Sequence, residues 1–314
     1  MMFCIAPGFK SEHSLFMTPQ THTDTYSQNM RGIVLVLLGS LMLSLMDGVM
    51  KHLLEQGYSV LQMMAVRGWF VVPLMAFWAW AKMPAGALKT KRPVAHFIRA
   101  FIGFFAPLFF FTALITLDLA DATVIVFGST FIMTVLSVPI LKEHVGRHRW
   151  AAVFFGFVGV LIAANPTGDF FKGGAVYAVF ASLAYALIMI MTRWLGKTES
   201  TFAQVFYFNA WAAFAATVIS FPDVSSIPYV DFGFIVLLGA LSVAGHFCLT
   251  HAFSIAPIGL VAPFEYSIIV WATLIGFFVW GDIPGSEVIL GGAVIVASGL
   301  YLLHREHGRK GGPA

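Results

Sequence analysis

Apolar stretches of about twenty residues recur along almost the whole chain, and short polar segments separate them. A stretch of roughly that length crosses the hydrocarbon core of a bilayer as an α-helix. The pattern therefore predicts an all-α polytopic membrane protein with ten transmembrane helices. Because most connections are short, we expect helices adjacent in sequence to pack as antiparallel neighbours. The predicted spans are residues 32–53, 60–81, 97–117, 122–141, 150–164, 174–195, 202–221, 232–254, 258–280 and 288–304.

Positive charge is distributed unevenly over these spans. If the N-terminus is cytoplasmic, 15 of the 18 Lys and Arg residues fall on the inner side of the membrane. The outer side holds only Lys51 and Lys172, and Arg67 lies inside the second span. Cytoplasmic loops carry an excess of Lys and Arg. The distribution predicts a multi-pass protein of a bacterial cell inner membrane with both termini in the cytoplasm.

The composition argues against a soluble protein. The chain is 59% hydrophobic and 11% charged, whereas soluble domains are about 25% charged. The net charge of +3 sits in short loops, which favours contact with anionic lipids over nucleic-acid binding. Cys4 and Cys248 are too few for a disulfide framework and lack the spacing of metal ligands.

Motifs of catalysis are absent from the sequence. It has no Gly-rich phosphate loop, no nucleotide-binding motif, no nucleophile elbow and no His/Cys cluster with metal-site spacing. We therefore expect no enzymatic activity, no cofactor and no metal. Without a hydrolysis domain, transport would be secondary, driven by a gradient or by exchange. A membrane scaffold or membrane enzyme with ten helices is the alternative from a different functional class.

The two halves of the chain resemble each other. A shift of 142 residues places the first span on the sixth, and a shift of 139 places Glu143 on Asp282. Under the first shift Gly32 meets Gly174, Ser40 meets Ser182, Lys51 meets Arg193, and Gln62 meets Gln204. Each half then has five helices, and an odd number inverts the second half relative to the first. Inverted repeats are a common architecture of secondary transporters, with the site between the repeats near the midplane.

This duplication predicts the domain organisation. Residues 1–31 form a disordered cytoplasmic tail, residues 32–166 the first repeat, residues 174–304 the second repeat, and residues 305–314 a basic cytoplasmic tail. Met17 and Met30 are alternative start positions that the sequence does not distinguish.

Several local strings resemble those of the drug/metabolite transporter superfamily, EamA type. The resemblance covers roughly residues 31–305, and it implies ten helices, cytoplasmic termini and a central substrate cavity lined by both halves. Members of that family move amino acids, nucleotide-like metabolites, vitamins and drugs. Asp282 stands where the family more often has Glu. The strings are residues 47–51 (DGVMK), 141–143 (LKE), 156–166 (GFVGVLIAANP), 262–266 (APFEY) and 299–300 (GL).

Four ionisable residues inside the spans are the main candidates for a site, because a charge in hydrocarbon is costly and usually faces a partner or a wet cavity. Asp47 and Arg67 lie at similar depth, roughly 10 Å below the outer surface at ~1.5 Å per residue. We expect them to pair; the alternative is that Asp47 ends its span in water and Arg67 snorkels outward. Glu265 and His246 lie roughly 10–13 Å from the inner surface. They predict a proton-coupling or substrate-ammonium site, or else a structural clasp.

Other residues complete the candidate site. Pro107 and Pro263 are predicted to kink the third and ninth spans, although a static bend would explain them equally. The deep aromatic residues could form a stacking or cation–π wall for a planar or cationic solute, or could simply pack. Asn209 occupies the second-half position that matches Arg67 and should find a partner. The deep aromatic residues are Tyr185, Tyr207, Tyr266 and Trp271. We interpret Arg99, Glu143 and Asp282 as anchors at helix ends, and Asp118 and Asp121 as solvated.

These features predict a secondary transporter that moves a small organic metabolite across the inner membrane by alternating access. A ring-bearing solute such as a riboflavin-like vitamin or an adenosyl-methionine-like compound fits, and so does an amino acid. A multidrug or toxic-metabolite efflux pump is the competing function. The expected partners are the small-molecule substrate, membrane lipids and protons as coupling ion, with the protein acting as a monomer or homodimer.

Overall fold

The computed structural model describes residues 22–83, 86, 88–142, 146–165, 173–196, 198–221, 229–256 and 258–310. The predictions for Cys4, Met17, Glu143, Lys172 and residues 311–314 lie outside this part of the chain.

The described part of the chain is helical and contains no strand. Every predicted span coincides with helix, but the fourth is divided into two helices and the ninth into three segments. The elements are α1 (His22–Glu55), α2 (Val60–Lys82), α3 (Pro93–Ala113), α4 (Leu119–Phe127), α5 (Ser129–Leu141), α6 (Arg147–Ala164), α7 (Gly174–Leu195), α8 (Thr201–Ser220), α9 (Tyr229–Ile255), α10 (Ile258–Val261), η3 (Ala262–Tyr266), α11 (Ser267–Trp280) and α12 (Ser286–Lys310).

Helix α1 corrects the predicted boundary of the N-terminal tail. It begins at His22, so residues 22–31, which the sequence assigned to a disordered tail, are helical. The polar residues there include no Gly or Pro between Thr21 and Arg31, so the helix continues beyond its apolar part. Helix α12 likewise extends through the predicted basic tail to Lys310.

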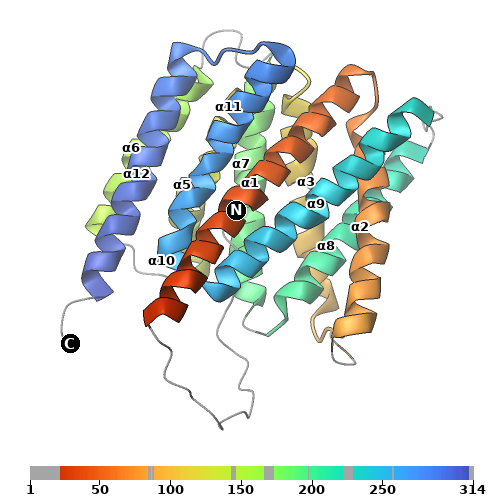
Figure 1. Ribbon diagram of the computed structural model, residues 1–314, viewed down its shortest axis with the longest axis horizontal. Helices are drawn as coiled ribbons and strands as arrows, with labels where there is room; N and C mark the ends of the chain where they lie inside the picture. The colour runs from red at the N-terminus through yellow and green to blue at the C-terminus, as the bar shows by residue number, and fades with distance from the viewer. Residues whose placement is uncertain are drawn as a thin grey trace.

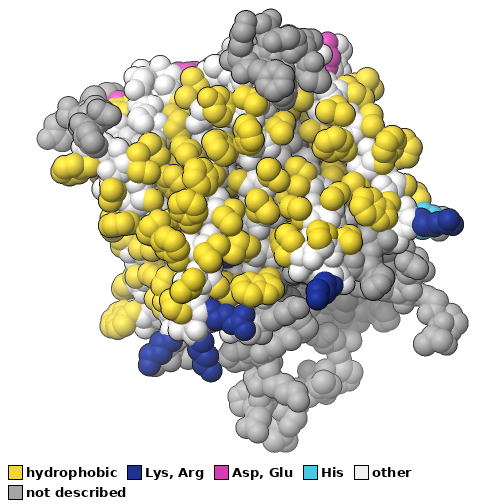
Figure 2. Space-filling model, turned by 180° about the vertical axis from the view of Figure 1, so that it is seen from behind, with side chains coloured by type: hydrophobic (Ala, Val, Ile, Leu, Met, Phe, Trp, Pro, Cys, Tyr) yellow, Lys and Arg dark blue, Asp and Glu magenta, His cyan; other side chains and the backbone are white. Residues whose placement is uncertain are grey.

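The helices have the length and composition of a multi-pass membrane protein. Seven helical segments, one of which is Leu119–Ile140 from α4 and α5 taken together, are long and apolar enough to cross a bilayer, among the residues described. Three shorter apolar helical segments lie at Trp150–Ala164, Phe264–Trp280 and Ser286–Tyr301. The face shown in Figure 2 is covered by hydrophobic side chains, with Asp and Glu at one end and Lys and Arg towards the other. On this face, acidic and basic side chains therefore gather at opposite ends of the bundle.

The main helix pairs each join one helix of the first half of the chain to one of the second half. The pairs are α1 with α9, α2 with α8, α3 with α7, and α6 with α12. In Figure 1, α6 and α12 lie side by side at one edge of the bundle, and α2 and α8 lie towards the other. The predicted repeat makes α1 equivalent to α7, α2 to α8, α3 to α9, and α6 to α12. Under this equivalence the α1–α9 pair corresponds to the α7–α3 pair. The α2–α8 pair and the α6–α12 pair each correspond to themselves.

Glycine permits the closest of these helix contacts. A Cβ at Gly39 would lie 3.1 Å from the carbonyl oxygen of Gly245, so α1 and α9 approach through their backbones. A Cβ at Gly159 in α6 would lie 2.9 Å from the carbonyl oxygen of Gly291 in α12. Small residues at such crossings are the usual means by which membrane helices pack closely.

Candidate functional site

Two interrupted helices meet in the interior of the bundle. Helix α4 ends at Phe127 and α5 begins at Ser129, with Gly128 between them. In the second half, the 3₁₀ segment η3 separates α10 from α11. The Phe127 and Tyr266 rings, one beside each interruption, have centroids 5.4 Å apart. Interrupted helices near the midplane are where transporter sites form, because their backbone groups become available to a ligand.

Proline accounts for only one of these interruptions. Pro263 lies in η3, where its missing N–H suits the change from α-helix to 3₁₀-helix. Pro107 lies within α3, which continues from Pro93 to Ala113. The break at Gly128 was not predicted from the sequence, although the Gly128-Ser129 pair is a recognisable weak point.

Each interrupted helix receives a serine hydrogen bond from the opposite half. Ser182 in α7 donates to the carbonyl oxygen of Ile125 in α4, over 2.9 Å. Ser44 in α1 donates to the carbonyl oxygen of Ile268 in α11, over 3.3 Å. The first helix of each half thus contacts the interrupted helix of the other half. The Ile125 carbonyl oxygen also accepts from the Gly128 amide, so Ser182 adds a contact between the halves at this interruption.

Glu265 lies in η3, with 9% of its surface exposed, in a group of polar side chains. Its charge is within electrostatic range of Tyr185 in α7 and of Tyr266. The Tyr185 hydroxyl, the Ser267 hydroxyl and the Trp271 indole N–H are buried and have no hydrogen-bond partner in the described part of the chain. Buried polar groups normally have a partner. These three therefore have bonding capacity that a polar solute could use, and two of them belong to the predicted aromatic wall.

A second group of charges lies in α1, α2 and α9. Asp47 and Arg67 are within electrostatic range of each other, and Arg67 is also within range of His246. Asp47 and Arg67 make no ion-pair contact. The two side chains of the predicted pair are therefore near each other without touching. All three keep part of their surface accessible although they lie far from the helix ends. A bound solute could therefore reach both signs of charge.

Glu265 and His246 lie on different elements and have different described neighbours, Tyr185 for Glu265 and Arg67 for His246. His246 Nδ1 lies 2.7 Å from the carbonyl oxygen of Ser242, one turn earlier in α9, and its charged neighbour is Arg67. The sequence predicted the depths of the two side chains but not the directions in which their helices face. The predicted proton exchange between them is therefore not seen in this arrangement.

Two predicted site residues lie elsewhere. The Tyr207 hydroxyl donates to the carbonyl oxygen of Leu88 in the α2–α3 connection, over 2.6 Å, near the end of the bundle. It is therefore not part of a central aromatic wall. The Asn209 side chain donates to the carbonyl oxygen of Val205 in its own helix, over 2.9 Å, which corresponds to the structural alternative.

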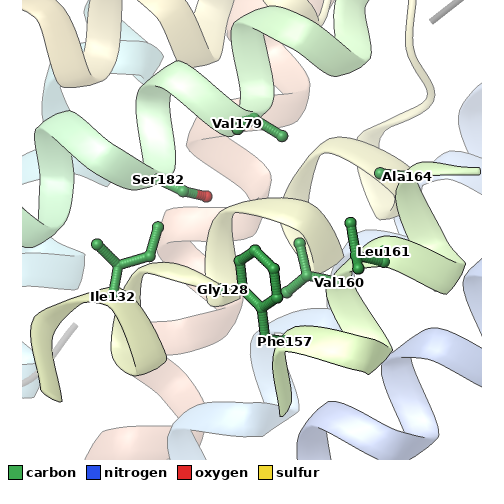
Figure 3. A pocket seen from close by; sticks show the side chains of 8 residues that line it. All are labelled: Gly128, Ile132, Phe157, Val160, Leu161, Ala164, Val179 and Ser182. Carbon is green, nitrogen blue, oxygen red and sulfur yellow. The ribbon is translucent and has the colours of Figure 1, made fainter. Parts of the chain in front are cut away.

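A small apolar cavity of about 170 Å³ lies beside the break between α4 and α5. Figure 3 shows the Ser182 hydroxyl as the one side-chain oxygen among its labelled residues. The cavity contains none of the charged residues predicted for the site. Its lining comprises Gly128, Ile132, Phe157, Val160, Leu161, Ala164, Val179 and Ser182.

An ionic network closes the end of the bundle that carries the acidic residues, which the sequence placed on the outer side. Lys51 Nζ lies 3.0 Å from Asp282 Oδ2 and 3.7 Å from Asp118 Oδ1. Lys51 also lies 4.8 Å from the centroid of the Trp280 ring. Burial and the nearby Asp282 charge raise the pKa of the Asp118 carboxyl, while Lys51 opposes them. Asp282 is thus a partner of Lys51 and not only a helix-end anchor.

The opposite end contains a buried polar cluster that the sequence did not predict. Arg99 is 3% exposed; its Nε donates to the Thr192 hydroxyl over 2.9 Å, and a terminal nitrogen donates to the Gln204 carbonyl oxygen over 2.8 Å. Arg99 is therefore a buried partner of α7 and α8 and not only an anchor at a helix end. The repeat match of Gln62 with Gln204 was the available signal that this position is special, since both glutamines are buried.

Comparisons with known proteins give a consistent result. Residues 30–165 match the model of the EamA-like transporter family. An S-adenosylmethionine uptake transporter of Rickettsia felis is 27% identical over 70% of this chain and 74% of its own length. A riboflavin transporter of Vibrio cholerae is 27% identical over 53% and 56%, and a pseudopaline exporter of Pseudomonas aeruginosa is 27% identical over 67% and 75%.

The fold also matches a solved structure. One crystal structure superimposes with a TM-score of 0.59 at 15% identity, over 91% of this chain and 98% of the other. That likeness concerns the fold alone. Separately, the match of residues 30–165 to the EamA-like transporter family agrees with the resemblance found in the sequence.

Proposed function

We propose that this chain, of which residues 30–165 match the EamA-like transporter family, is a secondary carrier that moves a small organic metabolite by alternating access. The observation that carries the proposal is the meeting of two interrupted helices, one from each half, beside buried polar groups with free bonding capacity. Such a site lets a solute replace water contacts while the two halves rock around it. The family match to residues 30–165 supports the same conclusion.

Two inverted five-helix repeats, with ten spans in all, are part of the proposal. The exchange symmetry of the helix pairs supports them. So does the contact between Phe127 and Tyr266, whose positions differ by 139 residues, the same shift that relates the fourth and ninth spans. A pair of equivalent residues in mutual contact is expected where a two-fold axis passes between two repeats.

The proposed location is a bacterial inner membrane with both termini in the cytoplasm. The basic end of the bundle would then face inwards and the Lys51 network outwards. The oligomeric state and the coupling ion stay predictions, with Glu265 as the candidate group for binding either a proton or a substrate ammonium.

The proposed substrate is a small solute that carries both signs of charge and an apolar or aromatic part. Arg67 would bind a carboxylate, Asp47 and Glu265 a cationic group, and Tyr185, Tyr266 and Trp271 a ring or a sulfonium. S-Adenosylmethionine has all of these groups, and several relatives are named as its uptake transporters. Export of a metabolite is the second candidate, favoured by the similarity to the pseudopaline exporter.

The test is counterflow into liposomes that contain the purified protein. Labelled S-adenosylmethionine should enter against an unlabelled internal pool, and unlabelled riboflavin and amino acids should be assayed as competitors. Glu265→Gln and Arg67→Ala should each reduce flux roughly tenfold or more, since a charged hydrogen bond is worth about 1.5–3 kcal/mol. Glu287→Gln, an exposed acid at the end of the bundle, is the matched control. If folded protein exchanges none of these solutes, the scaffold alternative replaces the carrier.

A further inference from the structure

The basic end of the bundle holds a polar cluster, which we call the inner clasp, between the α2–α3 connection and the α7–α8 connection. The Lys91 backbone amide donates to Glu199 Oε1 over 3.0 Å, and His96 Nε2 lies 3.4 Å from Glu199 Oε2. The Tyr207 ring lies against the His96 ring, with centroids 4.9 Å apart. The inner clasp consists of Lys91, His96, Arg99, Glu199, Gln204 and Tyr207.

These side chains are unusually well buried for polar groups at the end of a helix bundle. His96 and Arg99 are each 3% exposed, Gln204 is 1% exposed and Glu199 is 9% exposed. Neither ring nitrogen of His96 and neither side-chain polar atom of Gln204 makes a hydrogen bond with the described residues. Burying a polar group without a hydrogen-bond partner costs free energy. The cluster therefore has unused capacity to bind a proton or water.

The inner clasp joins the two halves of the chain. His96, Arg99 and Lys91 belong to the first half, whereas Glu199 and Gln204 belong to the second. Arg99 adds two hydrogen bonds across the same boundary, to Thr192 and Gln204. Any opening of this end by movement of one half against the other must separate these groups.

The charged and titratable groups described around His96 lie on α3, on α8 and on the two connections. Glu199 is the one described carboxylate among them, so it is the group that a proton on His96 would meet. Burial raises the pKa of the Glu199 carboxyl, but hydrogen bonds from the Lys91 amide and the Thr90 side chain, together with the nearby His96 side chain, outweigh burial and hold its pKa below the usual value. The ionised form of Glu199 is therefore favoured. The other groups are Tyr207 on α8, Arg99 one turn along α3, and Lys91 and Arg92 in the preceding connection.

We propose that His96 is a proton-binding site whose protonation locks the inner clasp through Glu199 and whose deprotonation favours opening of that end. Protonated imidazole pairs with the carboxylate in a buried setting and supplies two donors; neutral imidazole supplies one and no charge. Protonation of His96 therefore adds an ion pair with Glu199 to the closed arrangement, which an opened, hydrated one lacks. By linkage, low pH favours the closed inner end and high pH the open one.

This inference rests on the proposed alternating access, but it is tested without substrate. Spin labels are attached at Lys89→Cys and Thr198→Cys, two exposed positions on the connections that the inner clasp joins. The distance between the two labels is measured in full-length protein lacking Cys4 and Cys248. Between about pH 5 and pH 8, the window in which imidazole titrates, the long-distance fraction should rise roughly three- to tenfold as pH rises. His96→Gln should abolish this dependence.

His148→Gln is the matched control. It lies on α6 at the same end of the bundle and is exposed, with Nδ1 2.9 Å from the Tyr301 hydroxyl, so it should leave the response unchanged. Glu199→Gln provides a second test if His96→Gln unfolds: it should flatten the same profile by removing the carboxylate.

Two outcomes would overturn the inference. One is a distance between the spin labels that stays constant from about pH 5 to pH 8 when the inner clasp is unsubstituted. The other is a pH response that survives in folded His96→Gln or Glu199→Gln protein, which would assign it to groups such as Glu265 or His246. If the liposome assay shows no flux but the distance between the labels still depends on pH, the proposed carrier function is wrong and the proposal for the inner clasp stands.

Discussion

The two ends of the bundle are both held by contacts between the halves of the chain, but they differ in how far those contacts are removed from solvent. At the inner clasp, His96, Arg99, Glu199 and Gln204 are each at most 9% exposed. At the other end, the Lys51 side chain is 7% exposed, while its partners Asp282 and Asp118 are 20% and 41% exposed. A buried network is strong but costly when broken, whereas partly solvated ion pairs exchange with water and salt. The two ends should therefore respond to different solution variables.

The largest effect should follow from Arg99→Met. The change removes two hydrogen bonds and leaves the Gln204 carbonyl and the Thr192 hydroxyl to find other partners. We expect a loss of roughly 2–4 kcal/mol, because hydrogen bonds to charged groups contribute about 1.5–3 kcal/mol each. Thermal unfolding in detergent should show a clear drop in melting temperature. Arg147→Met, at an exposed position of the same end, should change it little; equal effects would contradict the importance of burial.

Lys51→Met should have an intermediate effect. It leaves the Asp282 carboxylate without its 3.0 Å partner and removes the cation from the Trp280 ring. We expect about 1–2 kcal/mol, less than for Arg99, because solvent reaches Asp282 and Asp118. Lys82→Met, an exposed lysine at the other end, is the control. A loss larger than that of Arg99→Met would reverse the comparison between the ends.

Salt should distinguish the two ends without mutation. Spin labels at Gln56→Cys and Ile283→Cys, both exposed beside the Lys51 network, should separate when salt rises from about 0.1 M to about 1 M, because the Debye length falls from roughly 10 Å to 3 Å. The Lys89 and Thr198 labels should stay at their distance over the same range. Equal salt responses at both ends would show that burial does not shield the inner clasp.

The smallest effect concerns Tyr58, which donates to Asp231 Oδ2 over 2.6 Å. This hydrogen bond, together with burial and the carboxylate charge, raises the pKa of Tyr58 to about 12. Asp231→Asn should return the phenol towards its ordinary titration range, so that it ionises at lower pH, with little change in melting temperature. Ultraviolet difference titration of the variant against the parent measures this; an unchanged curve would mean that Asp231 does not govern Tyr58.

Sequence reasoning predicted the features that depend on one helix at a time. The apolar stretches predicted the helices, and the uneven Lys and Arg distribution predicted which charges share an end. The depth of Asp47 and Arg67 also followed from counting residues along a helix. Depth is a property of one helix, whereas a contact also needs the direction in which each helix faces. Glu265 and His246 had matching depths but lie in separate groups for this reason.

Features made by connections between helices could not be predicted in the same way. Tyr207 lies well inside its predicted span, yet Leu88 in the α2–α3 connection reaches its hydroxyl. Arg99 was interpreted as a loop charge because the sequence does not show that α7 and α8 cover it. The break at Gly128 lacks proline, and it arises where α4 packs against α7 and α11. These features depend on which helices become neighbours.

The close approach of Gly159 to Gly291 has a consequence for motion. At this crossing the α6 and α12 backbones lie against each other, with Ala163 and Ile295 packed beside them, so sliding between the two helices would meet immediate steric resistance. Helices α6 and α12, at this edge of the bundle, should therefore move together as one rigid unit. Displacement during a working cycle would then be confined to the remaining helices, which turn against it.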